Sequence, residues 1–113
     1  MADKRIVVDL DGTLCSQEEF GRYEYAEPRR EVIDRLKELA VAGFHITIFT
    51  ARGMKTFDGN VSEAKKHLLW LTKRWLKEHQ VPYHRLRFGK PPADYYLDDK
   101  ALTIDDFLAR KEL

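Results

Sequence analysis

The stretch Arg5-Ile-Val-Val-Asp-Leu-Asp11 decides how the rest of the sequence is read. The residues before Asp9 are β-branched and apolar at odd and even positions alike, which is typical of a strand that is covered on both faces of a parallel sheet. The two acids are two residues apart, so in a continuing strand their carboxylates point to the same side. Gly12 then permits a sharp turn. The stretch therefore predicts a parallel strand that delivers two carboxylates to one edge of a sheet.

The remainder of the chain alternates between helical and strand patterns. Apolar residues recur at helical spacing from Pro28 to Gly43 and again over residues 61–79. Further strands are predicted at residues 44–50, 86–88 and 95–97, and a closing helical turn at 103–108. Strands that alternate with helices imply right-handed crossovers. We expect a three-layer α/β/α Rossmann-like parallel sheet with helices on both faces.

Composition sets the outer limits of this interpretation. The chain has 113 residues, of which 43% are hydrophobic and 35% charged, so we expect one domain over residues 1–113 with a packed core. The one cysteine, Cys15, cannot form an internal disulfide, which favours a cytoplasmic protein. The net charge of +1 implies no global attraction to nucleic acid or membranes, and no apolar run approaches the length of a bilayer span. Function is expected from local sites.

Polar side chains follow each predicted strand, where ligands of open parallel sheets bind. They are Asp9 and Asp11, Thr50 and Arg52, Lys90, and Asp98 and Asp99. Neighbouring carboxylates need a counter-ion, and an all-oxygen donor set favours Mg²⁺ over Zn²⁺. Lys90 and Thr50 suit a phosphate. The pattern predicts a phosphoryl site in which a carboxylate attacks phosphorus while the metal and the lysine neutralise charge.

These residues resemble the four motifs of the haloacid dehalogenase superfamily. The motifs are Asp9-Leu-Asp-Gly-Thr13, Thr50, Lys90 and Asp98-Asp99, in that order. The resemblance implies that Asp9 is the nucleophile and that Asp11 is the general acid/base, with its backbone carbonyl bound to Mg²⁺. Thr50 and Lys90 would contact the phosphate. Asp99 would bind the metal directly, and Asp98 would support that ligand or bind the metal through a water molecule. An aspartate at position 11 fits the phosphatases of the superfamily, because a leaving alkoxide needs a proton.

Loop sequences narrow the resemblance to small phosphatases found among capsular-polysaccharide biosynthesis proteins. The similar stretches are Thr50-Ala-Arg-Gly-Met54, Gly59-Asn-Val61, Val81-Pro-Tyr83, Gly89-Lys-Pro91 and Tyr96-Leu-Asp-Asp99. A β-hairpin flap and a helical squiggle are implied within residues 12–26, and no segment is long enough for a cap domain. The expected substrate is a small phosphorylated metabolite, plausibly a sugar phosphate.

The loop after the second predicted strand supplies hypothetical substrate contacts. Arg52, Lys55 and Asn60 are the candidates. For Arg52 a structural salt bridge, to Asp58 or Glu63, is an equally good interpretation. Cys15 has no basic partner at a spacing that suits nucleophile activation, so it is expected to fill space.

Other function classes share part of this pattern. The same aspartyl-phosphate can pass its phosphoryl group to a hydroxyl, so a phosphotransferase stays open. A receiver-like signalling domain also combines an acidic pair, a phosphorylated Asp, a Thr and a Lys, but there the acidic pair comes before the phosphorylated Asp and the Lys comes last. An idle relative that only binds is a third alternative.

Residues 61–90 carry eight Lys or Arg against two Glu, which could suggest a nucleic-acid surface. Most of these bases fall on the polar face of the predicted helix without interleaved aromatics, so a solvated face is the better interpretation. Trp70 falls on the same polar face. Large aromatic residues are enriched at interfaces, so Trp70 motivates the hypothesis of a homo-oligomer.

Overall fold

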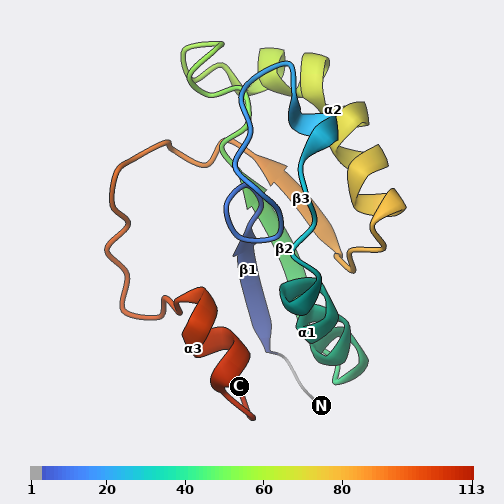
Figure 1. Ribbon diagram of the computed structural model, residues 1–113. Coiled ribbons are helices and arrows are strands. Elements are labelled where there is room, and N and C mark those ends of the chain that lie inside the picture. The colour runs from blue at the N-terminus through green and yellow to red at the C-terminus, as the bar shows by residue number, and fades with distance from the viewer. Residues whose placement is uncertain (1–3) are drawn as a thin grey trace.

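The computed structural model describes residues 4–113 and contains three parallel strands with helices packed beside them (Figure 1). The elements in chain order are β1 (Arg5–Asp9), the short 3-10 helix η1 (Tyr23–Tyr25), α1 (Arg30–Val41), β2 (His45–Thr50), α2 (Val61–Glu78), β3 (Arg85–Phe88) and α3 (Ile104–Ala109). The strands lie in the order β1-β2-β3, with Val8 opposite Ile48 and Ile48 opposite Leu86. The predicted parallel α/β sheet is confirmed.

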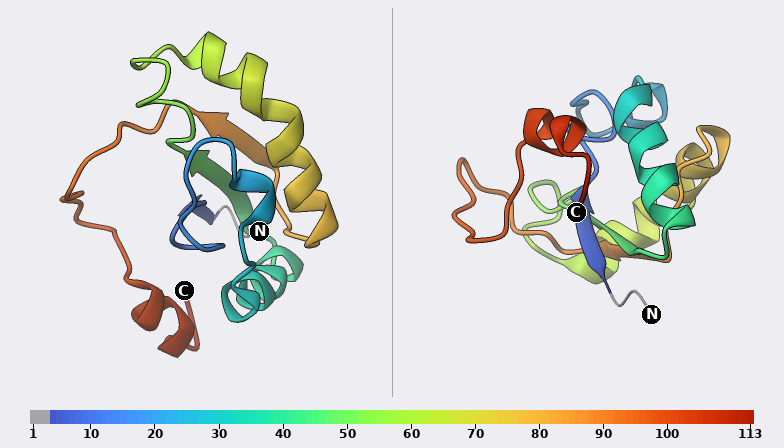
Figure 2. Two further views of the ribbon diagram at one scale, coloured as in Figure 1. Left: turned by 45° about the horizontal axis from the view of Figure 1, so that its top comes forward. Right: turned by 90° about the horizontal axis from the view of Figure 1, so that it is seen from below.

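Both long helices lie on the same side of the sheet (Figure 2). Two right-handed crossovers between strands in sequential order produce this arrangement. Side chains that point toward α1 and α2, such as Ile48 and Thr50, are fully buried. The alternate positions are more accessible, because Val7 is 64% exposed and Arg85 and Arg87 are exposed as well. In residues 4–113 the sheet therefore forms one layer, and α1 and α2 form a second layer on one of its faces. The helix α3 lies beyond β1, beside α1.

Local sequence signals set the helix boundaries. The Asn60 side chain accepts a hydrogen bond from the backbone N–H of Glu63 at 3.0 Å and so caps α2, and Thr103 caps α3 in the same way through Asp106. Gly43 follows α1 with a φ of 97°, a conformation that ends helices and favours glycine. The caps place α2 so that the indole N–H of Trp75 donates to the Ala26 carbonyl at 2.9 Å.

The strand predicted at residues 95–97 is wrong. The segment from Pro91 to Lys100 is exposed and forms neither helix nor strand. A strand needs a neighbour for its backbone N–H and C=O groups, and no described strand pairs with this segment. Aromatic and apolar residues alone are not enough to build one.

Residues 12–26 differ in part from the flap and squiggle that the resemblance implies. The structure has turns here, two isolated bridges that join Cys15 to Asp11 and to Pro28, and the 3-10 helix η1. Residues 14–16 and 27–29 pair antiparallel, with the Ser16 N–H donating to the Glu27 carbonyl at 2.9 Å and the Arg29 N–H to the Leu14 carbonyl at 2.8 Å, although neither stretch is long enough to count as a strand. This connection begins at the carboxyl end of β1 and leads back to α1 (Figure 1).

None of the helices in residues 4–113 combines the length and the apolarity that a bilayer crossing demands.

Candidate functional site

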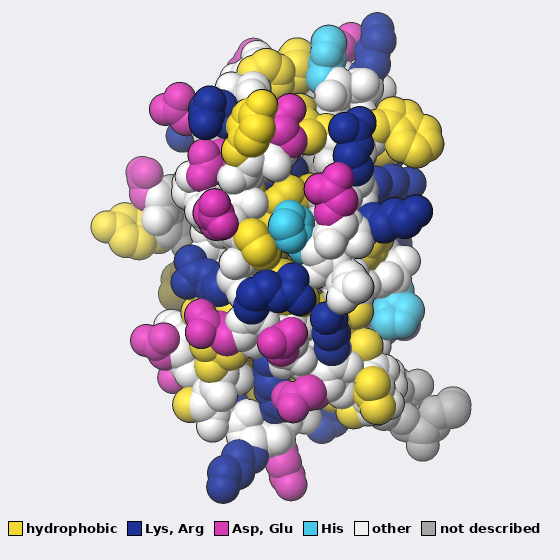
Figure 3. Space-filling model, turned by 45° about the vertical axis from the view of Figure 1, so that its right-hand side comes forward, with side chains coloured by type: hydrophobic (Ala, Val, Ile, Leu, Met, Phe, Trp, Pro, Cys, Tyr) yellow, Lys and Arg dark blue, Asp and Glu magenta, His cyan; other side chains and the backbone are white. Residues whose placement is uncertain are grey.

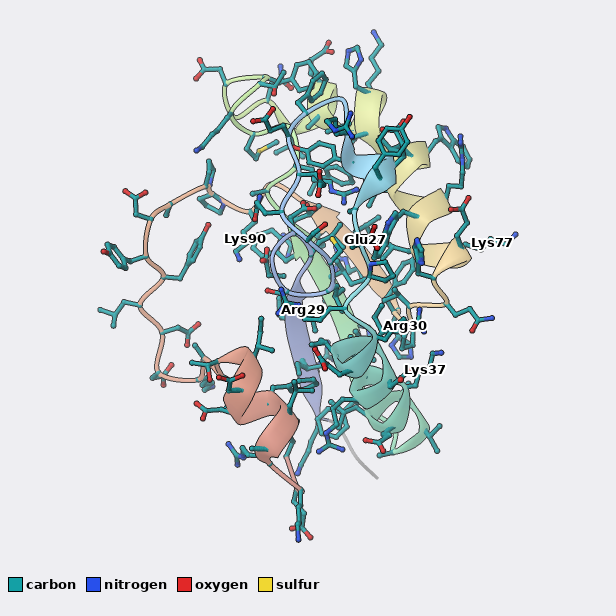
Figure 4. All side chains as sticks on the ribbon, in the orientation of Figure 1. Glu27, Arg29, Arg30, Lys37, Lys77 and Lys90 are labelled. Carbon is teal, nitrogen blue, oxygen red and sulfur yellow. The ribbon has the colours of Figure 1, made fainter. Side chains whose placement is uncertain are left out.

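Asp9 and Lys90 meet at the carboxyl ends of the strands. Asp9 is the last residue of β1, and Lys90 follows β3, where its backbone N–H donates to the Thr50 carbonyl at 3.1 Å. The Lys90 Nζ lies 3.1 Å from Asp9 Oδ1, and the Thr13 hydroxyl donates to Asp9 Oδ2 at 3.2 Å. Figure 4 labels Lys90 at this end of the sheet. Two segments far apart in the sequence, residues 9–13 and Lys90, thus meet at one carboxylate, as predicted for Asp9 and Lys90.

The Asp9–Lys90 pair remains accessible. The two side chains are 32% and 18% exposed, and the Lys90 Nζ also lies 4.2 Å from the centre of the Tyr96 ring. A partly exposed ion pair is only weakly stabilising, because water screens it. Its charges are therefore better placed to bind a ligand than to hold the fold.

Asp11 is turned to a different partner. Its two carboxylate oxygens accept hydrogen bonds from Nε and Nη2 of Arg52, both at 2.9 Å, and the remaining Arg52 nitrogen donates to the Thr72 hydroxyl at 3.1 Å. The guanidinium carbon also lies 4.4 Å from the centre of the Tyr23 ring. This fork-to-carboxylate geometry is the strongest arrangement available to an arginine.

Arg52 is therefore not placed to contact a substrate. Its side chain is 0% exposed, and all three guanidinium nitrogens have partners inside the protein. The structural interpretation of Arg52 is the correct one, although the partner is Asp11 and not Asp58 or Glu63. Sequence spacing favoured the two acids nearest in the chain, one in the same loop and one in the first turn of α2, whereas the fold brings in a carboxylate 41 residues away.

The Asp11–Arg52 pair changes the chemistry of its neighbours. Burial raises the pKa of the Cys15 thiol to about 12, and the negative charge of Asp11, whose Oδ1 lies 3.5 Å from the Cys15 sulfur, adds to the increase. Burial and Asp11 also raise the pKa of Tyr23. A thiol that resists ionisation is a poor nucleophile, which agrees with the space-filling role expected for Cys15.

Thr50 lies beneath this site. Its side chain is fully buried at the end of β2, and its hydroxyl oxygen accepts the backbone N–H of Arg52 at 3.0 Å. Thr50 does not line the cavity beside Asp9, so the structure does not expose its hydroxyl to a phosphate there.

Lys55 and Asn60 lie in the exposed loop before α2. Asn60 uses its side-chain oxygen to cap that helix. Neither residue lines the cavity beside Asp9. The structure therefore gives Asn60 a structural role and leaves Lys55 without a contact to the predicted site.

Of the neighbouring Asp98 and Asp99, only Asp98 faces the cavity that Asp9 lines. A cavity of about 790 Å³ lies between β1 and residues 91–103, and its lining includes Asp9, Thr13, Lys90 and Asp98, whereas Asp99 is not part of it. Asp98 Oδ1 accepts the backbone N–H of Lys100 at 2.8 Å. Among residues 4–113, no three acidic, histidine or cysteine side chains lie close enough together to hold a metal ion.

Sequence reasoning missed several contributors to the site. Thr72 and Tyr23 hold Arg52, Thr13 holds Asp9, and the Tyr96 ring contacts Lys90. Thr72 carried a usable signal, because a hydroxyl on the buried stripe of a helix needs a hydrogen-bonding partner. Tyr23 had none, because its position depends on the path of the loop before α1.

The polar face of α2 follows the sequence expectation. Trp70 is 76% exposed, and the Lys73 Nζ lies 5.8 Å from its ring centre. Figure 3 shows basic and acidic side chains interspersed over this side of the molecule. A mixed surface of this kind is typical of a solvated face.

The described geometry can now be compared with known proteins. No family model matches the sequence, and no curated protein matches it. The structure is similar to the crystal structure of a target protein from Vibrio cholerae, at 40% sequence identity and a TM-score of 0.89, with 95% of this chain and 89% of that chain covered. The chain belongs to the same family as this Vibrio cholerae protein. The family resemblance therefore extends over nearly the full length of both chains.

Two further similar structures are those of the Pnkp1/Rnl/Hen1 complex and the Pnkp1/Rnl/Hen1 RNA repair complex. Their sequence identities to this chain are 20% and 21%, with TM-scores of 0.58 and 0.56. They cover 86% and 84% of this chain, but only 31% and 30% of the larger chains. At this identity the similarity concerns the fold alone.

Proposed function

We propose that the chain is a Mg²⁺-dependent phosphatase of the haloacid dehalogenase type, which hydrolyses a small phosphomonoester, such as a sugar phosphate, through an aspartyl-phosphate. The observation that carries this proposal is the 3.1 Å contact between Asp9 Oδ1 and Lys90 Nζ at the carboxyl ends of the strands. A nucleophilic carboxylate and a fixed cation, both accessible, are what phosphoryl transfer requires of a protein.

The proposal includes the three-layer form of that fold and a cytoplasmic setting. The accessible face of the sheet, which carries Val7, is where a third layer would lie. Cys15 is a buried free thiol, which suits a reducing compartment. The family relationship to the Vibrio cholerae protein supports a shared fold, and the activity is our proposal for this chain.

Oxygen atoms beside Asp9 fit Mg²⁺ by their chemistry. They are the Asp9 carboxylate, the Asp98 carboxylate of the same cavity, and the backbone carbonyl of Asp11, which accepts none of the turn and loop hydrogen bonds in residues 4–113. When bound, magnesium would offset the charge of the phosphoryl oxygens. These donors alone are few for an octahedral ion, which usually keeps several waters as well.

The residues around Asp9 have separate tasks in the proposed reaction. One Asp9 oxygen forms a bond to phosphorus while the bond from phosphorus to the leaving oxygen breaks. Thr13 orients the carboxylate through its hydrogen bond, and Lys90 moves from Asp9 toward the phosphoryl oxygens as their charge develops. Water then attacks phosphorus, phosphate leaves, and Asp9 is restored.

Asp11 supplies the proton to the leaving oxygen and later accepts one from the attacking water. In the structure both of its oxygens accept hydrogen bonds from Arg52, so before it can act as an acid the side chain must release at least one of them and take up a proton from solvent; the proton later accepted from the attacking water restores this acid form. Arg52 is thus a positioning residue for Asp11, whose side chain does not line the cavity beside Asp9 while this pair is formed. The path of the proton depends on that ion pair opening.

A panel of phosphorylated sugars, nucleotides and carboxylic acids, assayed for Mg²⁺-dependent phosphate release, tests the proposal. We expect release from at least one sugar phosphate, and a loss of about 10³-fold or more in Asp9→Asn with the fold intact. Asp34→Asn is the matched control, because Asp34 lies exposed on α1, and it should keep full activity. Wild-type rates in Asp9→Asn, or no release from any compound, would contradict the proposal. A stable phosphoprotein without turnover would instead favour a receiver-like domain.

A further inference from the structure

The segment from residue 91 to residue 103 has two different sides. Tyr96 and Asp98 line the cavity beside Asp9, and the Tyr96 ring contacts Lys90. Tyr95 and Leu97 do not line it, and their side chains are 91% and 104% exposed. Successive side chains of an extended chain point in opposite directions. The segment therefore presents one side to its own site and a large apolar side to the outside.

This chain cannot cover the outer side of the segment by itself. At one end of the segment, the Lys90 N–H donates a hydrogen bond to the Thr50 carbonyl. At the other end, the buried Phe107 anchors α3 to the core. Movement of the segment toward β1 would bury Tyr96 and Asp98 and still leave Tyr95 and Leu97 outside. A second molecule is needed to bury them.

The same chain offers a surface that lacks cover. β1 is an edge strand, because the order of the described strands is β1-β2-β3, and Val7 on it is 64% exposed although it faces the chain's own cavity. Unpaired edges of sheets readily accept a strand from another chain. Figure 2 shows the segment after β3 running on the side of the sheet away from α1 and α2, next to this edge. The uncovered surface and the exposed segment are therefore neighbours on one side of the molecule.

The charges of these two regions are opposite. The outer side of the segment carries the exposed Asp99, and the accessible face of the sheet carries the exposed Arg85 and Arg87 outside the cavity lining. Opposite potentials on two patches favour their association. A second copy of this chain brings both patches at once, which favours it over an unrelated partner.

We propose that two copies of this chain associate about a two-fold axis, so that the outer side of residues 94–99 of each copy packs against β1 and the accessible sheet face of the other. Each copy gives and receives the same contact, which is the isologous arrangement of most dimers. Asp99, which does not line the cavity of its own chain, is thereby carried to the Asp9 site of the second copy. This last step rests on the proposed function, whereas the association does not.

Sedimentation at micromolar concentration tests the association. The wild-type chain is expected to sediment as a dimer and Leu97→Asp as a monomer, because Leu97 has no contact to lose within its own chain. Val41→Asp is the matched control, since Val41 is 90% exposed on α1, and it should remain dimeric. Trp70→Asp should also remain dimeric. A monomeric wild type, or a monomeric Trp70→Asp beside a dimeric Leu97→Asp, would overturn the proposed interface.

Disulfide trapping separates exchange between copies from closure within one copy. Chains that carry Val7→Cys are mixed with differently tagged chains that carry Leu97→Cys, and then oxidised. A disulfide between the two tags is expected. The double variant Val7→Cys/Leu97→Cys should likewise give covalent dimers on a non-reducing gel. An intramolecular disulfide in the double variant, with none between tagged chains, would overturn the proposal.

Co-expression of Asp9→Asn with Asp99→Asn tests whether Asp99 acts on the second copy. Each variant alone is expected to be inactive. If Asp99 acts across the interface, half of the random dimers contain one intact site of two, so about a quarter of the wild-type activity returns. No recovery, or full activity of Asp99→Asn alone, would overturn this step. If the wild type releases no phosphate, the proposed function fails, while sedimentation and disulfide trapping still decide the association.

Discussion

Replacement of Arg52 by Met should destabilise the fold far more than the loss of an exposed arginine. Arg52 is fully buried and donates to both oxygens of Asp11 and to the Thr72 hydroxyl. Methionine keeps most of the apolar stem, so the variant removes the charge and the hydrogen bonds with little change of packing. Asp11, whose side chain is only 10% exposed, is then left as an unpaired carboxylate.

The expected cost follows from that unpaired charge. Removal of one partner of a buried ion pair costs about 3–5 kcal/mol, because the remaining charge stays desolvated. For a chain of 113 residues, an unfolding entropy of about 2.1 cal/mol/K per residue converts this loss into a fall in Tm of roughly 13–21 °C. Since domains of this size are stable by about 5–15 kcal/mol, the variant should fold but melt early.

Thermal and urea unfolding followed by circular dichroism measures the effect. Arg30→Met is the matched control, because Arg30 pairs with Asp34 at 3.8 Å on the surface of α1 and should lose less than about 1 kcal/mol. In an Asp11→Asn background the cost of Arg52→Met should shrink, since the charge that needs pairing is gone. A loss for Arg52→Met no larger than that of Arg30→Met would refute the structural role of Arg52.

Three further outcomes follow from the described contacts. Gly53→Ala should destabilise the fold by about 1–3 kcal/mol more than Gly59→Ala in urea unfolding, because both glycines have positive φ but only a Cβ at Gly53 would meet Ala64 Cβ, at 2.8 Å; equal losses would contradict this. The Cys15 thiol has a pKa raised to about 12 in the fold, against an ordinary value of 9.0 in the unfolded chain, so its contribution to stability is complete below pH 9 and is lost as the pH rises from 9 to 12; Cys15→Ala should show a shallower alkaline loss of stability, and an equally steep loss would contradict this. Lys90→Met should lower phosphate release by about 10²-fold or more with less than about 1 kcal/mol lost in stability, and a normal rate would argue against its role.

The strands and helices could be predicted from the sequence because their signals are local. Three β-branched residues after Arg5 and the apolar spacing after Pro28 predicted β1 and α1, and the structure has both. The convergence of Asp9 and Lys90 followed from one further rule, that parallel strands end at a common edge. Each of these inferences needed only chain order and periodicity.

The partner of Arg52 and the state of residues 95–97 could not be predicted in this way. The link from Arg52 to Asp11 depends on how a loop and the buried side of α2 pack, and the sequence shows nothing of that distance. Residues 95–97 have the composition of a strand but lack a neighbour within residues 4–113. Strand formation depends on tertiary pairing more than helix formation does, so a strand pattern alone overpredicts.

Trapping of the intermediate is the most direct test of the claim that Asp9 is a phosphatase nucleophile. The protein is mixed with an active phosphomonoester and Mg²⁺, quenched in acid during turnover, and treated with borohydride, which reduces an acyl phosphate but not a free carboxylate. Mass spectrometry of the peptides should then show homoserine at position 9 and at no other aspartate. An unmodified Asp9 during steady phosphate release, or a modified residue elsewhere in the chain, would contradict the account.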